Sequence, residues 1–480
     1  MKPKEACGVF GAYSPGGRVF ELIYYGLTAL QHRGQESAGI ATLEAEGELK
    51  VEKAMGLVGE IFNPEASVKF KGEIGIGHVR YSTVGTSSIV DAQPFQLDGI
   101  AVCHNGNLVN YLELRRLLAS KGVKLISTCD AEVLGYLLRG DKEQPDAGQV
   151  VEALSMVSEL AEGSYSALCL TGKGEIVAFR DPHGFRPLCY GKTPEAYLCA
   201  SESVALDACG GNMLSKVEPG EALIISRRGV ERVRFAPCRR RAHCMFEYVY
   251  FSRPDSMVED RSVYEVRLRL GENLGKTYGC KADIVVPVPD TARPAAEGIS
   301  RVTGVPVAEG LIKNRYIHRT FIMPGQRRRE NAVKMKLNPL KAVLKGKSVC
   351  LVDDSIVRGT TIRNIISIVR EAGAREVHVK ITCPPIISPC FYGIDIATHQ
   401  ELIAAGRSVE EIRRLIGADS LDYQTIEGLV DAVGIGKENL CLACLTGNYP
   451  TPKAQRLADK MKGKPPPREG FRYIELEEAA

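Results

Sequence analysis

The stretch from Val349 to Thr361 limits the fold of this chain more than any other. A short apolar run, Val349–Val352, is followed by Asp353 and Asp354, and then by a loop that ends at Gly359. Such a run is typical of a parallel strand that is covered on both faces. Ligands of open α/β sheets bind at the carboxyl ends of such strands, where these two acids would lie. The stretch therefore predicts a strand, a ligand-binding loop and a helix.

The predicted helix begins near Thr360 or Thr361, either of which is expected to cap it. Its apolar residues recur at helical spacing, at Ile362, Ile365, Ile366 and Val369. A loop that leads into a helix N-terminus suits a phosphate, because the first N–H groups of a helix are free. Two acids just before the loop suit sugar hydroxyls or phosphate-bound Mg²⁺. Taken alone, the same residues would also fit an ordinary strand–loop–helix unit with solvated acids.

Composition narrows the class of protein. A length of 480 residues predicts about two to four domains. The content of 44% hydrophobic and 25% charged residues is typical of a soluble globular protein. The net charge of +4 gives no argument for nucleic acid. The 15 cysteines, without a signal-peptide or membrane-spanning pattern, favour reduced thiols. We therefore expect a cytoplasmic protein that binds neither nucleic acid nor a membrane.

The stretch from Val349 to Thr361 closely resembles the signature of type I phosphoribosyltransferases, which bind phosphoribosyl pyrophosphate (PRPP). The resemblance implies that the two acids contact the ribose hydroxyls and a metal, and that the loop holds the 5-phosphate. A Walker loop is excluded because its Gly-Lys-Ser/Thr ending is missing. The PRPP-binding residues implied in this way are Asp353, Asp354, Ser355, Arg358, Gly359, Thr360 and Thr361.

Strands alternate with longer helices from about residue 244 to 444, which predicts a doubly wound parallel sheet. One predicted strand, Ala282–Pro289, leads into a turn that carries Thr291. The resemblance assigns Thr291 to the pyrophosphate and Mg²⁺ region, together with Asp353 and Asp354.

The basic segment Lys313–Asn331 resembles the flexible loop that closes over PRPP in this family. Closure would bring cations to the diphosphate and exclude water. Its candidate phosphate contacts are Arg319, Arg327 and Arg329.

Residues 7–235 show mixed strand and helix patterns and four motifs. These are Cys7–Gly11, Leu30–Gly39, His78–Thr83 and His104–Asn107. Each has an ordinary explanation when taken alone: an early cysteine is usually a buried small hydrophobe, and Asn-Gly is a strong turn signal. Removal of residues 1–6 would nevertheless give Cys7 an α-amine with a pKa of about 8. Such an amine can serve as the base for its own thiol.

In their order, these motifs resemble the glutaminase domain of N-terminal-nucleophile amidotransferases, whose fold is an α/β/β/α sandwich. The resemblance implies that Cys7 attacks the glutamine amide after removal of a propeptide, so the chain would be made as a zymogen. Arg80 would pair with the substrate α-carboxylate, since a guanidinium fork fits a carboxylate. Asp130 would bind the α-amine. Asn105 and Gly106 would form the oxyanion hole.

Cys441 and Cys444 form a Cys-x-x-Cys pair, which alone indicates a redox pair, half a zinc site or coincidence. Together with the segments around Cys244 and Cys390, the pair resembles the iron–sulfur branch of glutamine PRPP amidotransferases. The resemblance implies a [4Fe–4S] cluster held by these four thiolates. Four thiolates would also suit zinc.

The two halves together resemble glutamine PRPP amidotransferases over nearly the whole chain. The implied reaction converts glutamine, PRPP and water into 5-phosphoribosylamine, glutamate and pyrophosphate, the first committed step of purine (IMP) biosynthesis. Ammonia would pass internally to C1 of PRPP, and Tyr250 is expected to help couple the two sites. The resemblance also implies inhibition by purine nucleotides and a homo-oligomer, usually a tetramer.

The expected organisation is a propeptide (1–6), a glutaminase domain (7–235), a phosphoribosyltransferase domain (236–450) and a peripheral extension (451–480). Two other functions fit parts of the sequence. Another amidotransferase with the same glutaminase half would need sugar-isomerase motifs in its second half. A regulator that only binds PRPP would not need the four N-terminal motifs.

Overall fold

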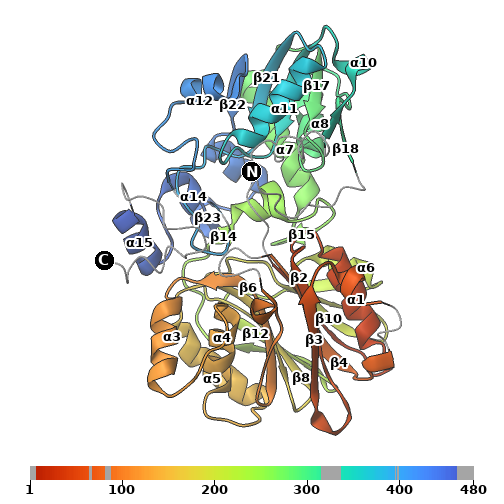
Figure 1. Cartoon of the computed structure of the whole chain (residues 1–480), viewed down its shortest axis with the longest axis vertical. Coiled ribbons are helices and arrows are strands. Elements are labelled where there is room, and N and C mark those ends of the chain that lie inside the picture. The colour runs from red at the N-terminus through yellow and green to blue at the C-terminus, as the bar shows by residue number, and fades with distance from the viewer. Residues whose placement is uncertain are drawn as a thin grey trace.

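The computed structural model describes residues 7–63, 68–81, 88–314, 337–394, 396 and 399–461. The chain forms two bodies stacked along its long axis, with the N-terminal half below the C-terminal half in Figure 1. We call residues 7–235 the N-terminal half and residues 236–461 the C-terminal half. Within the described ranges, none of the helices combines the length and the apolar character needed to cross a bilayer.

The N-terminal half contains two antiparallel sheets. The described strands of the first follow the order β11-β9-β10-β1-β4-β2-β3, and those of the second the order β13-β12-β8-β7-β6-β5. The first sheet consists of β1 (Gly8–Tyr13), β2 (Ser37–Leu43), β3 (Leu49–Met55), β4 (Ile74–Arg80), β9 (Cys189–Lys192), β10 (Tyr197–Ala200) and β11 (Asn212–Lys216). The second consists of β5 (Phe95–Leu97), β6 (Ile100–Leu108), β7 (Gly163–Thr171), β8 (Glu175–Arg180), β12 (Glu221–Ser226) and β13 (Gly229–Arg234).

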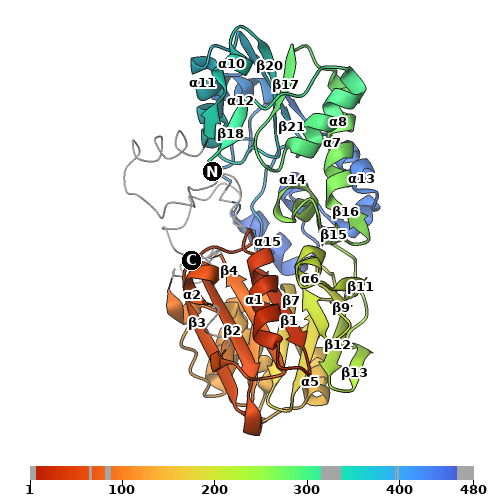
Figure 2. The same cartoon turned by 90° about the vertical axis from the view of Figure 1, so that its right-hand side faces the viewer.

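Helices cover the outer faces of both sheets (Figures 1 and 2). Successive side chains of a strand point to opposite faces, so in β1 Val9 lies in the core between the sheets and Phe10 in the core under the helices. The helices over the first sheet are α1 (Val19–Ala29), α2 (Val58–Ile61) and α6 (Ser203–Ala208). Those over the second are α3 (Tyr111–Ser120), α4 (Asp130–Arg139) and α5 (Ala147–Leu160). The predicted α/β/β/α sandwich is confirmed.

The C-terminal half contains a parallel sheet in the order β17-β20-β21-β22. Its strands are β17 (Ile284–Pro287), β20 (Ser348–Asp353), β21 (Glu376–Ile381) and β22 (Ser420–Tyr423). Val285 and Cys350 pack towards α8, whereas Val349 and Leu351 pack in the core that includes α11 and α12. The predicted doubly wound sheet is therefore confirmed. Its helices are α7 (Val263–Tyr278), α8 (Arg293–Thr303), α10 (Lys341–Leu344), α11 (Thr360–Glu371), α12 (Val409–Ile416) and α13 (Ile426–Val433).

The order of this sheet reverses beside β17. Val307 forms a parallel bridge to Val285 on one side of β17, and β20 pairs with β17 on the other side. After β17, the chain therefore first adds the segment at Val307 on one side of this strand and then adds β20 on the other side. A crevice at the carboxyl ends of two such strands is where doubly wound sheets bind ligands, so the fold points to the ends of β17 and β20.

The remaining described elements are short. They are β14 (His243–Cys244), β15 (Met257–Val258), β16 (Arg261–Ser262), β18 (Leu311–Lys313), β19 (Leu337–Pro339), β23 (Leu440–Cys441), α14 (Ala443–Thr446), α15 (Pro452–Met461), the π-helical turn η4 (Glu247–Phe251), and the 3₁₀ turns η1 (Ala45–Gly47), η3 (Ile89–Asp91) and η5 (Lys437–Asn439).

Helix α15 lies at the junction of the two bodies (Figure 1). Leu457 and Met461 are buried in a core cluster that also contains Val109 and Phe391. This part of the segment expected to be peripheral is instead packed against both halves, because its amphipathic face covers apolar side chains at the junction. Residues 462–480 lie outside the described residues.

Candidate functional site

Cys7 lies immediately before β1, beside the end of β4. Gly8 is opposite Val79 in the antiparallel pair, so Cys7 comes next to the residues that follow β4. Its half-buried Sγ donates a hydrogen bond to the carbonyl oxygen of Tyr81 at 3.6 Å. The sandwich thus places the predicted nucleophile at the end of the sheet. Residues 1–6, the predicted propeptide, lie outside the described residues.

Two charged residues predicted for this site act on the Cys7 thiol. Burial raises the pKa of Cys7, Asp130 raises it further, and Arg80 lowers it. Both side chains are therefore within electrostatic reach of Sγ. Arg80 is 3% exposed, and its Nη1 lies 3.4 Å from Glu36 Oε1. A fixed cation beside the thiol is complementary to the α-carboxylate of an amino acid, and a fixed carboxylate is complementary to its α-amine.

Asp130 is the first residue of α4 and is fixed by β6. Its Oδ2 accepts a hydrogen bond from the Leu108 N–H at 2.9 Å, and its Oδ1 lies 3.1 Å from Nε2 of His104. The carbonyl oxygen of His104 in turn lies 3.2 Å from Nε2 of His78 on β4, which joins the two sheets. The sequence prediction missed His104 as a partner of Asp130, although its motif contains both His104 and Asn105.

Asn105 and Gly106 lie within β6, which continues to Leu108. The expected Asn-Gly turn is wrong, because this segment pairs with β7 from Ile100 to Leu108. Gly106 has φ +154°, and a Cβ there would lie 2.0 Å from the Ser164 carbonyl oxygen, so only glycine fits. Asn105 is 1% exposed, and among the described residues its Nδ2 has no hydrogen-bond partner. A buried amide donor without a partner is costly unless a ligand uses it.

A buried ion-pair network links Cys7 to the C-terminal half. Arg33 donates from Nε to the Cys7 carbonyl oxygen at 3.0 Å. Its other nitrogens contact Glu202 at 2.5 Å and Glu247 of η4 at 2.8 Å. Arg186 binds Glu247 from another side at 3.1 Å. Although burial opposes ionisation, Arg33 and Arg186 keep the pKa of Glu247 below its usual value. The sequence prediction did not assign a role to these residues.

A second site lies at the carboxyl ends of β17 and β20. Asp353 is the last residue of β20, and Asp353 and Asp354 are each 1% exposed. Thr291, which follows β17, donates a hydrogen bond to Asp354 Oδ2 at 2.5 Å. Ser355 donates to Asp354 Oδ1 at 2.7 Å. The structure thus brings the two predicted segments together at the reversal of strand order.

The predicted phosphate loop leads into α11. The N-cap of α11 is Gly359 in the left-handed conformation, with φ +76°. Thr360 and Thr361 lie in the first turn, so the expected threonine cap is wrong. A glycine cap has no side chain to occupy the first N–H groups, and this suits an anion. Arg358 Nη2 contacts Glu401 at 3.1 Å. The candidates Arg319, Arg327 and Arg329 lie outside the described residues.

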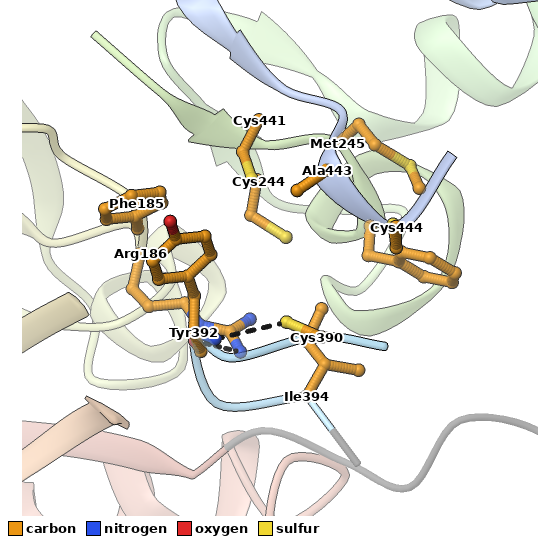
Figure 3. Close-up of a pocket in the computed structure, with 11 residues that line it drawn as sticks. Phe185, Arg186, Cys244, Met245, Cys390, Tyr392, Ile394, Cys441, Ala443 and Cys444 are labelled. Atoms are coloured by element: carbon orange, nitrogen blue, oxygen red, sulfur yellow. Dashed lines mark hydrogen bonds between the residues drawn. The ribbon is translucent and has the colours of Figure 1, made fainter. Parts of the chain in front are cut away.

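All four predicted cluster ligands line one cavity at the junction (Figure 3). The parallel pairing of β14 with β23 sets Cys244 opposite Cys441, and Cys444 follows at the start of α14. Cys390 approaches from the other side in Figure 3. Burial raises the pKa of all four thiols, that of Cys244 to about 12. Arg186, which also lines the cavity, lowers the pKa of three of them.

The fold and these sites define a glutamine amidotransferase domain joined to a phosphoribosyltransferase domain. Family profiles described as "Glutamine amidotransferase domain" and "Phosphoribosyl transferase domain" match residues 78–208 and 261–385. The amidophosphoribosyltransferase of Methanothermobacter thermautotrophicus is 50% identical over 455 residues, which cover 94% of this chain and 95% of the relative. That of Bacillus subtilis is 46% identical over 456 residues, covering 93% and 94%. The chain belongs to the amidophosphoribosyltransferase family.

Solved structures agree with this assignment. Glutamine PRPP amidotransferase from Bacillus subtilis, complexed with ADP and GMP, is 45% identical, with a TM-score of 0.85 over 93% of this chain and 97% of that chain. A structure of the allosteric regulatory enzyme of purine biosynthesis is also 45% identical, with a TM-score of 0.86 over 93% of this chain and 96% of that chain. The chain is therefore a phosphoribosyl-transferring enzyme of the first step of purine biosynthesis.

Proposed function

We propose that Cys7 releases ammonia from glutamine and that the site at Asp353 and Asp354 adds this ammonia to PRPP. The observation that carries the proposal is the buried Nδ2 of Asn105, which has no partner among the described residues. Its strand also supports Asp130, which acts on the Cys7 thiol. An oxyanion hole requires a hydrogen-bond donor that is already in place when negative charge develops on the substrate oxygen.

Removal of residues 1–6 would supply the base for Cys7. Burial raises the pKa of the thiol, so the uncut chain holds it largely protonated at neutral pH. A free α-amine at Cys7 would take the thiol proton as Sγ attacks the glutamine amide carbon. Ammonia then leaves with that proton, and water hydrolyses the glutamyl thioester. Arg80 and Asp130 hold the α-carboxylate and the α-amine of glutamine during both steps.

The second site would bind PRPP at the reversal of strand order. The loop from Ser355 to Thr361 and the N-terminus of α11 suit the 5-phosphate. Two carboxylates and a hydroxyl, from Asp353, Asp354 and Thr291, are oxygen donors that suit Mg²⁺. A Mg²⁺ held there would also bind the diphosphate and polarise it as the leaving group. These residues position C1 of PRPP so that internally transferred ammonia attacks it as pyrophosphate leaves.

Coupling of the two sites is proposed to pass through η4. Tyr250 lies in this turn, is half-buried and packs against the core of the C-terminal half. Glu247 of the same turn binds Arg33, which binds the Cys7 carbonyl oxygen. A movement of η4 on PRPP binding would therefore reach the nucleophile through two ion-paired residues.

Cys244, Cys390, Cys441 and Cys444 are proposed to hold a [4Fe–4S] cluster. Their convergence on one cavity supports this donor set, because four thiolates are what such a cluster binds. In the described part of the chain, no three His, Cys, Asp or Glu side chains are placed to hold a single metal ion. Four thiolates would also suit zinc, and the resemblance of the surrounding segments to the iron–sulfur branch favours the cluster. Such a cluster would brace the junction between the halves.

Purine nucleotides are proposed as regulators, since the similar Bacillus subtilis enzyme was solved with ADP and GMP. A homo-oligomer, a tetramer by resemblance, is proposed as the working form. Light scattering would test the oligomer, and glutamine-dependent pyrophosphate release with and without ADP and GMP would test the regulation.

The proposed function predicts that anaerobically purified protein supplied with glutamine, PRPP and Mg²⁺ releases glutamate and pyrophosphate together. Cys7→Ala should abolish glutamine-dependent pyrophosphate release but keep release driven by added ammonia, because the second site is intact. Intact mass would show whether residues 1–6 are absent. Glutamine hydrolysis without PRPP consumption by the parent protein would refute the assignment.

A further inference from the structure

A loop of the C-terminal half, Pro389–Ile394, reaches the strand that carries Asn105 and Gly106. We call this segment the strap loop. Tyr392 of the strap loop stacks on Phe185 with ring centroids 4.1 Å apart, and its hydroxyl lies 3.0 Å from Thr451 Oγ1. Arg186 donates to the Tyr392 carbonyl oxygen at 3.1 Å (Figure 3). The strap loop is thus fixed by aromatic and polar contacts from two other segments, Phe185–Arg186 and the residues at Thr451.

Hydrogen bonds join the strap loop to β6 and β7. Asn107 Nδ2 donates to the Phe391 carbonyl oxygen at 2.8 Å. Ser164 Oγ donates to the Tyr392 carbonyl oxygen at 2.9 Å and accepts from the Asn107 N–H at 3.1 Å. Ser164 is fully buried and Asn107 is 6% exposed. Asn107 is therefore bound to the strap loop directly through its side chain, and through Ser164 by its backbone N–H.

Two glycines also lie close together at this contact. Gly393 has φ +91°, and a Cβ there would lie 2.9 Å from both the carbonyl carbon and the carbonyl oxygen of Gly106. Any side chain at Gly393 would press on the peptide that follows Gly106 unless the backbone shifted. The strap loop therefore packs directly on the backbone at the proposed oxyanion hole.

We propose that the strap loop is a positioning element for the glutaminase reaction, and that Gly393 and Ser164 are its positioning residues. The inference rests on the proposed function, because it takes Asn105 and Gly106 as the oxyanion donors. The strap loop fixes the direction in which these donors point. Glutamine is bound by Arg80 on β4 and by Asp130 at the start of α4, which has its own contacts with His104 and Leu108. Oxyanion stabilisation depends on donors that are fixed before the reaction. Loss of the strap contact should therefore slow catalysis without weakening glutamine binding.

The test compares Gly393→Ala with Gly406→Ala. Gly406 also has a positive φ, +72°, but a Cβ there meets no atom within 4 Å, so this variant controls for backbone strain. We expect Gly393→Ala to lower the glutaminase kcat about 10- to 100-fold, part of the loss seen when an oxyanion donor is removed. KM for glutamine, ammonia-driven synthesis, the rate of Cys7 alkylation by iodoacetamide and iron content should remain those of the Gly406→Ala protein. Ser164→Ala, which keeps the strap sequence, should show the same pattern.

Unchanged kcat in both Gly393→Ala and Ser164→Ala would overturn the inference and leave the proposed function intact. A rise in KM alone, or a loss of iron that parallels the loss of kcat, would also overturn it, since the effect would then act through binding or through the cysteine cavity. Asn105→Ala is the separate check on the proposed function. Normal glutaminase activity in that variant would refute the oxyanion assignment itself.

Discussion

At the scale of single residues, the environment of Cys7 differs from that of an ordinary surface thiol. Burial is the main cause of its raised pKa, and the neighbouring carboxylate of Asp130 adds to it. Arg80 opposes both. A chain that retains residues 1–6 would therefore keep Cys7 in the less reactive thiol form, since the thiolate is the reactive species.

This environment predicts slow alkylation of Cys7 in molecules that retain residues 1–6. Because the pKa is raised above 9.0, the thiolate fraction at pH 7 is small and should grow about tenfold for each pH unit until the pH passes the pKa. Peptide mass spectrometry after iodoacetamide treatment would follow the rate from pH 7 to 10. Exposed Cys238 is the internal control. Equal rates for Cys7 and Cys238 at pH 7 would contradict the prediction.

Candidate site residues could be named from the sequence where one local motif contained the chemistry, as for Cys7, Asn105 and Asp354. The network of Arg33, Glu247 and Arg186 could not. Arg33 and Glu247 are 214 positions apart, and each looks like an ordinary charged residue in its own segment. Only the packing of the two halves shows that their charges are buried and paired.

At the scale of elements, the loop into α11 depends on one glycine. Gly359 has a left-handed backbone, and a Cβ there would lie 2.4 Å from Cδ1 of Ile403. The loop can therefore pass close to Ile403 only without a side chain at this position. This contact also explains why glycine, and not the expected threonine, is the N-cap.

Gly359→Ala is therefore expected to lower kcat/KM for PRPP about 10- to 100-fold, because a small displacement of a binding loop is costly. Gly304→Ala is the matched control: Gly304 is also left-handed, with φ +75°, but a Cβ there meets no atom within 4 Å. Both variants should lose about 1 kcal/mol of stability from backbone strain. Kinetics with added ammonia would measure the PRPP site alone. Similar kcat/KM values in the two variants would count against a phosphate loop here.

The elements themselves were largely predictable, since apolar periodicity follows the alternation of each strand and the repeat of each helix. The Asn105-Gly106 pair shows where local signals fail. Asn-Gly favours a tight turn in isolation, but the pairing of β6 with β7 continues through it. The contact that makes glycine necessary comes from Ser164, which no short window of sequence contains.

At the scale of the whole molecule, α15 joins the end of the described chain to the N-terminal half. Leu457 is 2% exposed in the cluster that includes Val109 and Phe391. The backbone N–H of Lys453 donates to Glu162 Oε1 at 2.5 Å. The junction is therefore closed by a helix that the sequence pattern placed at the periphery.

Leu457→Ala should reduce the free energy of unfolding by about 2–5 kcal/mol, the usual cost of a buried Leu→Ala change. Leu415→Ala in α12 is the control, because Leu415 is 52% exposed and its loss should cost no more than about 0.5 kcal/mol. Urea denaturation of both variants would measure the difference. Glutamine-dependent activity should also fall more than ammonia-driven activity in Leu457→Ala. Equal stability of the two variants would show that α15 does not brace the junction.

The contact between Asn107 and Phe391 spans 284 positions of the chain, and this separation has a consequence during synthesis. A ribosome completes the whole N-terminal half well before it adds the strap loop. An unfinished polypeptide would already contain Cys7 but would lack the carbonyl groups that hold β6 in place. On this basis, a truncated translation product would hydrolyse the cell's glutamine more slowly than the finished chain, because β6 would be fixed only once the half that consumes the ammonia had also been made.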